Sequence, residues 1–153
     1  LTAAGLSFES ETDTETVALL TRHYMDQGLA PVEAAKATLK RLHGAFALCF
    51  LFAGEDDLMI AARKGSPLAI GYGDGEMYVG SDAIALAPMT DRITYLEEGD
   101  WAVITRKGAT ILDANNARAD MRLNSQIFED TRDPCFRAFL SKPKFWHSVE
   151  FMA

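Results

Sequence analysis

The 153-residue chain has 22 acidic and 15 basic side chains and a formal net charge of −7, so we expect no nucleic-acid partner, because an acidic surface repels the phosphate backbone. No apolar run approaches the ~20 residues of a membrane-spanning helix, and the 48% hydrophobic content fits one globular domain without a membrane partner. Two widely spaced cysteines, Cys49 and Cys135, are too few for a disulfide framework. We therefore expect a cytoplasmic protein.

The first 44 residues predict a pair of helices. Thr12 and Glu15 have the spacing of a capping box, in which each side chain accepts a hydrogen bond from the other residue's backbone N–H. The helix that starts at this cap should run to about Gln27. A second helix should begin at Pro31 and end at Gly44. Because only about three residues join them, the two helices should pack antiparallel.

The next 70 or so residues predict strands. Residues 45–52 are apolar throughout, which predicts a central strand covered on both faces, with Cys49 buried within it. Asp82 has the position of an N-cap for a short helical turn at residues 83–86. Two helices followed by hairpins predict an α+β fold, with two helices packed on an antiparallel sheet. Further strands are expected at residues 6–9, 58–63, 67–71, 77–80, 93–96, 101–105 and 109–112.

Five blocks of sequence are specific in combination, because they occur in one order and at regular spacing. They are residues 8–15 (FESETDTE), 61–68 (AARKGSPL), 70–76 (IGYGDGE), 81–86 (SDAIAL) and 95–100 (YLEEGD). Together they resemble the glutaminase domain of the class II glutamine amidotransferases. Within that class they are most similar to the glutamine–fructose-6-phosphate aminotransferases, which form glucosamine 6-phosphate.

This resemblance implies part of an αββα sandwich of the N-terminal-nucleophile hydrolase type. In that family an N-terminal cysteine attacks the side-chain amide of glutamine, with its own α-amine as base. The ammonia passes to a separate sugar-phosphate isomerase domain. The cysteine, the arginine that binds the glutamine carboxylate and the oxyanion asparagine belong to the first part of the family domain, which in register would lie upstream of Leu1. The resemblance implies no metal and no organic cofactor.

Asp13 is the one substrate contact of the family that maps onto this chain. It matches the aspartate that binds the α-amine of glutamine, so the resemblance implies glutamine as a partner. One helical turn later the family often carries a histidine, where this chain has Leu19. The residues alone also allow Asp13 to be a plain carboxylate at a helix start, and both interpretations stay open.

The resemblance ends near residue 118. We expect residues 1–118 to form a partial glutamine amidotransferase-like domain and residues 119–153 to form a divergent tail of unknown role. A class II glutaminase without its thiol has no nucleophile, so the first hypothesis is a truncated domain that is inactive alone. A hydrolase with another nucleophile and a non-catalytic association module remain alternatives. A partial sandwich leaves strand edges uncovered, which predicts a homo-oligomer.

Other potential nucleophiles are poorly placed in the sequence. The apolar surroundings predicted for Cys49 raise the pKa of a thiol and hide it. Cys135 lies near Arg132 and Arg137, which lower a thiol pKa, but it has no α-amine beside it to act as base. Loss of Leu1 would expose Thr2, far from the family's nucleophile position.

The remaining polar motifs give no recognisable catalytic pattern. A triad of Ser81, His43 and Asp82 would lack the Gly-x-Ser-x-Gly elbow. Residues 71–75 (GYGDG) precede a strand, so they predict a hairpin turn rather than a phosphate-binding loop. The three histidines lack the spacing of metal ligands; they are His23, His43 and His147.

Overall fold

The middle of the structure is a pair of antiparallel β-sheets. The computed structural model describes residues 1–119. The four-stranded sheet A has the strand order β1-β2-β6-β7, and the three-stranded sheet B has the order β4-β3-β5. The elements are η1 (Thr2–Ala4), α1 (Asp13–Asp26), α2 (Pro31–Leu39), β1 (Phe46–Leu51), β2 (Met59–Lys64), β3 (Ala69–Tyr72), β4 (Met77–Gly80), α3 (Ala83–Leu86), β5 (Ile93–Tyr95), β6 (Trp101–Thr105) and β7 (Gly108–Leu112).

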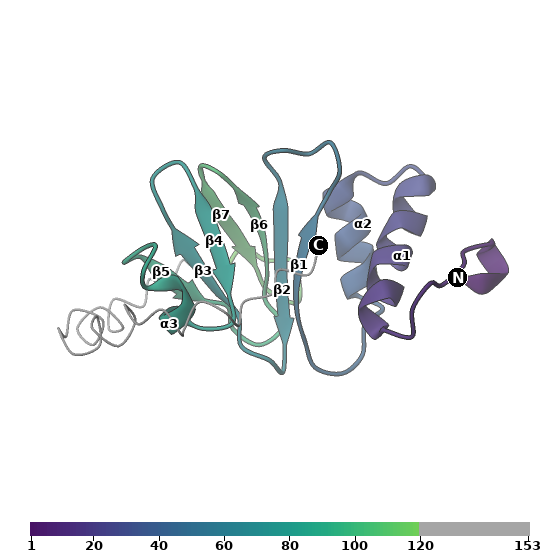
Figure 1. The fold of residues 1–153 in the computed structure, drawn as a ribbon, viewed down its shortest axis with the longest axis horizontal. Helices are drawn as coiled ribbons and strands as arrows, with labels where there is room; N and C mark the ends of the chain where they lie inside the picture. Colours follow the sequence, from purple (N-terminus) through teal and green to yellow (C-terminus); the bar gives the residue numbers. More distant parts are fainter. Residues whose placement is uncertain (120–153) are drawn as a thin grey trace.

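The four layers follow the order α, β, β, α (Figure 1). Helices α1 and α2 lie side by side outside sheet A, and the single turn α3 lies against sheet B (Figure 1). This arrangement confirms the predicted α+β fold and its partial αββα layering. None of the helices in residues 1–119 has the length and hydropathy needed to cross a membrane.

The alternation of side chains along each strand separates three apolar clusters. Ile70 and Ile104 are buried between the two sheets, where Ala61 and Leu96 also pack. The opposite face of sheet A places Ile60 against Ala35 of α2. The outer face of sheet B buries a third cluster beneath α3, made of Ala69, Ala83, Leu86 and Ile93.

A hydroxyl pair joins the two long helices. Thr21 on α1 and Thr38 on α2 are buried, and their Oγ1 atoms lie 2.9 Å apart. Thr21 also donates to the carbonyl oxygen of Val17 at 2.8 Å. Helix α2 is shorter than predicted: it ends at Leu39, a turn follows at residues 40–41, and the chain bends at Gly44 before it enters sheet A.

Strand β1 differs from its prediction. It is the edge strand of sheet A, and its side chains alternate between half-buried and exposed. Leu51 is 77% exposed, and Cys49 is exposed rather than buried. A uniformly apolar run predicts burial on both faces only if layers cover both faces. Here α2 covers one face, and no side chain of residues 1–119 buries the row Ala47, Cys49 and Leu51 on the other.

The strand predicted at residues 6–9 does not form. Residues 6–8 are irregular, and the chain bends at Glu9 and Ser10. The backbone N–H groups of Glu9 and Ser10 donate to the carboxylate of Glu15 instead of to a neighbouring strand, each at 2.7 Å. The other strand predictions are confirmed to within two residues at each end.

Candidate functional site

Asp13 is the first residue of α1, at the positive end of the helix dipole, where a carboxylate is stabilised. Its side chain is exposed and has no hydrogen-bond or ion-pair partner among residues 1–119. The carboxylate is therefore available to a cationic group from outside the described part of the chain. It is equally compatible with a plain helix-start residue, so its role as a ligand-binding group stays a prediction.

The segment before Asp13 is held by its neighbour Glu15. The hydroxyl of Thr12 accepts from the Glu15 N–H at 3.4 Å, as the capping-box spacing predicted. The Glu15 carboxylate differs from the prediction: it accepts from the N–H groups of Glu9 and Ser10 and from the Ser10 hydroxyl, not from Thr12. The Glu9 N–H and then the Ser10 hydroxyl hold the pKa of Glu15 below its usual value. An ionised Glu15 therefore fixes the loop that positions Asp13.

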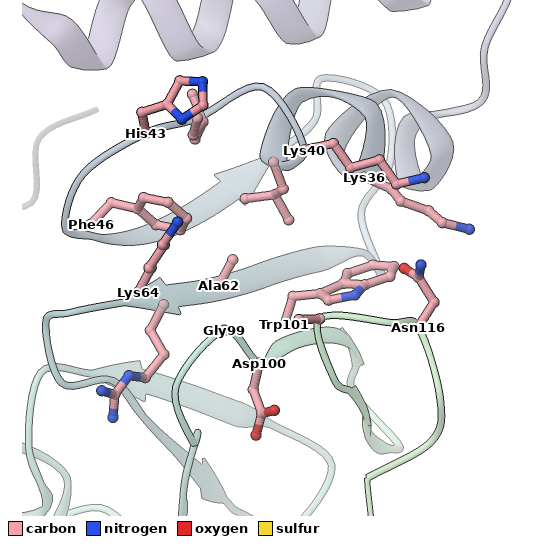
Figure 2. A pocket seen from close by; sticks show the side chains of 14 residues that line it. Lys36, Lys40, His43, Phe46, Ala62, Lys64, Gly99, Asp100, Trp101 and Asn116 are labelled. Carbon is pink, nitrogen blue, oxygen red and sulfur yellow. The ribbon is translucent and has the colours of Figure 1, made fainter.

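A second candidate is a cavity of about 320 Å³ between the end of α2 and one end of sheet A (Figure 2). Phe46, Ala62 and Trp101 supply apolar surface. Basic side chains surround it from separate segments, with Lys36 and Lys40 from α2 and its end, His43 from the following loop and Lys64 from β2.

Asp100 is the one acidic group among the described residues that line this cavity, and Figure 2 shows its carboxylate directed away from Phe46. It accepts from the backbone N–H of Glu97 at 2.8 Å and is only 7% exposed. Burial, and next the charge of Asp113, raise the pKa of Asp100, while the nearby Arg63 lowers it.

Arg63 links β2 to the segment between β5 and β6 at one corner of the cavity. Its guanidinium donates to the carbonyl oxygen of Leu96 at 2.9 Å and pairs with Glu98 at 3.0 Å. The Glu98 carboxylate also accepts from the Gly65 N–H, and this bond is the main reason why the pKa of Glu98 is lowered. Gly65 has φ +71°, and a Cβ there would lie 2.7 Å from the Ala45 Cβ, so the corner needs glycine.

The basic side chains of the cavity suit an anionic group held against an apolar wall. The described residues that line it include no hydroxyl and no thiol. Sequence reasoning did not single it out, because its walls come from segments far apart in the chain. Arg63, Lys64, Glu98 and Asp100 did lie in two of the recognised blocks, AARKGSPL and YLEEGD, and that was the available signal.

The catalytic residues considered from the sequence are not brought together. The Asp82 carboxylate caps α3 by accepting from the N–H groups of Ile84 and Ala85, on the sheet B side of the sandwich. His43 instead lines the cavity beside α2, on the sheet A side (Figure 2). Ser81, His43 and Asp82 therefore do not form a triad, in keeping with the missing Gly-x-Ser-x-Gly elbow. No group of three or more histidine, cysteine or acidic side chains in residues 1–119 could hold a metal ion.

The single described cysteine is a poor nucleophile. Cys49 lies on the exposed side of β1, yet partial burial of its sulfur raises the thiol pKa to about 11, so it is protonated at neutral pH. Thr2 lies in η1 and is exposed. Two further candidates, Cys135 and His147, lie outside the described residues.

Two other sequence motifs have structural roles. Residues 71–75 form the predicted hairpin between β3 and β4, where the Gly73 N–H donates to the Glu76 carbonyl oxygen at 2.9 Å. His23 lies on α1, 2.8 Å from the side-chain nitrogen of Gln27.

The recognised blocks and the layered fold agree with comparisons to known proteins. A family model described as a glutamine amidotransferase domain matches residues 1–88, which is more than half of the chain. The chain belongs to the glutamine amidotransferase domain family. The sequence resemblance is therefore confirmed at the family level.

Curated relatives at high identity are glutamine–fructose-6-phosphate aminotransferases (isomerizing). The protein from Brucella abortus biovar 1 is 60% identical over 116 residues, which cover 76% of this chain and 19% of the relative. One from Bradyrhizobium diazoefficiens is 64% identical over 109 residues, which cover 71% of this chain and 18% of the relative. The chain thus spans about a fifth of the length of these relatives.

A solved structure supports the fold assignment. Glutamine phosphoribosylpyrophosphate amidotransferase from B. subtilis, complexed with ADP and GMP, superposes with a TM-score of 0.58 at 27% identity. The match covers 80% of this chain and 26% of that chain. The curated relatives and the solved structure are therefore all much longer than this chain, which matches between 18% and 26% of their lengths.

Proposed function

We propose that residues 1–118 are one part of a glutamine-hydrolysing domain and that Asp13 binds the α-ammonium group of glutamine. The observation that carries the proposal is the position of Asp13 in the block FESETDTE of a glutamine amidotransferase domain, exposed and without a partner in residues 1–119. The helix dipole and the loop held by Glu15 support a fixed, ionised carboxylate at this position.

The nucleophile of this proposed reaction comes from polypeptide outside the 153 residues. Cys49 does not suit the role, because its thiol is protonated at neutral pH and it lies on an edge strand far along the chain from Asp13. We expect the chain alone to be inactive towards glutamine. None of the residues in the described range that line the cavity of Figure 2 carries a hydroxyl or thiol, which favours this proposal over a hydrolase with a different nucleophile.

The proposal for the whole protein follows from its relatives. In a glutamine–fructose-6-phosphate aminotransferase, the ammonia released from glutamine would be used to aminate fructose 6-phosphate, and the chain described here would be a truncated piece of the glutaminase domain. Residues 119–153 would form a separate tail. A cytoplasmic location is part of the proposal and is supported by the unpaired thiol of Cys49, which suits a reducing compartment.

Fragment complementation tests the proposal. The purified chain, with its intact mass verified, is assayed for ammonia release from glutamine, first alone and then with the N-terminal segment of the Brucella abortus relative that precedes the matched region. We expect release only in the mixture. Asp13→Asn should raise the KM for glutamine by roughly 10- to 100-fold, since a charge-assisted hydrogen bond contributes about 1.5–3 kcal/mol.

Glu11→Gln is the matched control, because it removes one negative charge from an exposed residue two positions away. It should leave the KM unchanged. Ammonia release by the chain alone would contradict the need for an outside nucleophile. A mixture in which Asp13→Asn and Glu11→Gln behave alike would reject the role of Asp13.

A further inference from the structure

The cavity of Figure 2 lies on the side of sheet A that α2 covers. Its apolar floor consists of Phe46, Ala62 and Trp101, which belong to the cluster beneath α2. Neither the exposed row of β1 nor the cluster between the two sheets contributes a residue to its lining. The site therefore does not depend on the uncovered edge of sheet A or on the face that β1 turns away from α2.

Positive charge gathers at the rim of this cavity, although the chain as a whole has a net charge of −7. Lys40, His43 and Lys64 are exposed, and none of them makes a hydrogen bond or an ion pair within residues 1–119. Lys64 acts on Glu98 through its charge alone. Lys36 pairs at 3.5 Å with an exposed glutamate of its own helix. Such a group of cations raises the local concentration of anions.

The acidic groups at this corner are engaged with other partners. Asp100 accepts from the Glu97 N–H at 2.8 Å, and its carboxylate is directed away from Phe46 (Figure 2). Glu98 does not line the cavity, and it pairs with Arg63 at 3.0 Å. An anion that enters the cavity therefore meets lysine side chains whose charge the neighbouring carboxylates do not neutralise.

Donors and an aromatic wall come together on one side of the cavity. Lys36 and Lys40 extend to the side where Trp101 and Asn116 lie (Figure 2). Among residues 1–119, Asn116 is the one non-glycine residue with a positive φ, 63°, a conformation that asparagine tolerates. The carboxylate of Asp113 holds this turn by accepting from two backbone N–H groups, each at 2.8 Å. Two ammonium groups and one amide are thus available beside a flat indole ring.

We propose that this cavity binds an organic phosphate monoester, with the phosphate at Lys36, Lys40 and Asn116 and the organic part against Trp101. Ammonium groups and an amide NH₂ are donors that phosphate oxygens accept, and a dianion uses two ammonium groups better than a carboxylate does. The volume of about 320 Å³ lies at the lower end of the range for small-molecule sites, so it suits an organic part of about one ring. The proposal is independent of glutamine binding, because Asp13 does not line the cavity.

Calorimetric titration of the full chain with phenyl phosphate tests the site. Phenyl phosphate carries the dianion and one ring, whereas inorganic phosphate has only the dianion and phenol only the ring. We expect one binding site with a Kd of about 1 mM or below, and roughly tenfold weaker binding of the other two compounds, because both parts of the ligand contribute. In the Trp146→Phe chain Trp101 is the one remaining tryptophan, so its fluorescence should change with the same midpoint.

Substitution of single lysines tests which cations hold the phosphate. Lys36→Gln and Lys40→Gln should each weaken the binding of phenyl phosphate by roughly three- to tenfold, because each removes a charge-assisted hydrogen bond at a partly solvated position. Lys107→Gln is the matched control, since it makes the same charge change in the exposed turn between β6 and β7, at the other end of β6 from Trp101. It should leave the Kd within about twofold.

The amide contact has its own pair of variants. Asn116→Asp keeps the size of the side chain and tolerates the positive φ, but it places a negative charge beside the phosphate. It should weaken binding by roughly tenfold or more. Asn115→Asp makes the same change at the exposed neighbour, which does not line the cavity, so its effect should be several times smaller.

The titration is repeated in the mixture with the N-terminal segment of the Brucella abortus relative, where we expect the same Kd. Loss of binding in the mixture would overturn the proposal, because polypeptide from outside the 153 residues would then fill the cavity. Equal affinity for phenyl phosphate and inorganic phosphate, or lysine variants that bind as well as Lys107→Gln, would also overturn it. Ammonia release from glutamine is a separate readout, so failure of phosphate binding leaves the proposal for Asp13 untouched.

Discussion

The hydroxyl pair between α1 and α2 allows the cost of two similar substitutions to be predicted separately. The single proton of the Thr21 hydroxyl is donated to the Val17 carbonyl oxygen, so the contact of 2.9 Å with Thr38 requires the Thr38 hydroxyl to be the donor. Both residues are buried, at 4% and 0% exposure. Valine matches threonine closely in shape and helix propensity, so hydrogen bonding dominates the comparison.

Thr38→Val removes the donor and leaves Thr21 still bonded to Val17, so it should lower the free energy of unfolding by only about 0.5–1 kcal/mol. Thr21→Val leaves the buried Thr38 hydroxyl without its acceptor and should cost about 1–3 kcal/mol. The double variant removes both polar groups and should be less destabilised than Thr21→Val alone.

Urea unfolding followed by circular dichroism measures all four chains, and the slope with denaturant checks that the transition stays two-state. Equal costs for the two single variants, or a double variant destabilised by the sum of the two, would refute the assignment of donor and acceptor. The Asp13 site should be unaffected by Thr38→Val, because α1 keeps its cap at Thr12.

Three further predictions concern the corners that hold the candidate sites. Gly65→Ala should lower the free energy of unfolding by about 2 kcal/mol or more, because the new Cβ would clash with Ala45. Gly75 has the same φ of +71° but lies in open space, so Gly75→Ala should cost only about 1 kcal/mol. The difference between the two variants in thermal unfolding measures the cost of the clash. Asp100→Asn should stabilise the chain at neutral pH, because the raised pKa of the aspartate means that its charge is unfavourable in the folded state. In urea unfolding, this gain in stability should shrink as the pH falls from the raised pKa of the folded state to the ordinary pKa of the unfolded state. Glu15→Gln should have the opposite profile: the lowered pKa means that the ionised carboxylate stabilises the fold above its unfolded pKa, so the difference between variant and parent should be full at neutral pH and vanish in acid, as measured by the same titration.

Much of the fold follows from local sequence signals. Thr12 caps α1 as expected, the hairpin at residues 71–75 forms, and α3 starts at the Asp82 cap, because each of these features depends on hydrogen bonds within a few residues. The family assignment was also available from sequence, since five ordered blocks are more specific than any one of them. The capping-box prediction was only half correct, because the Glu15 carboxylate accepts hydrogen bonds from the N–H groups of Glu9 and Ser10 instead of from Thr12.

The sequence by itself therefore determined the helices, most of the hairpins and the kinship with glutamine amidotransferases. The tertiary structure decided that the apolar strand β1 lies at the edge of its sheet and that Cys49 is exposed. It also decided that Arg63, Asp100 and Lys40 meet around one cavity. The physical reason is that apolar periodicity records which side chains favour burial, whereas the layers that are present decide which of them become buried.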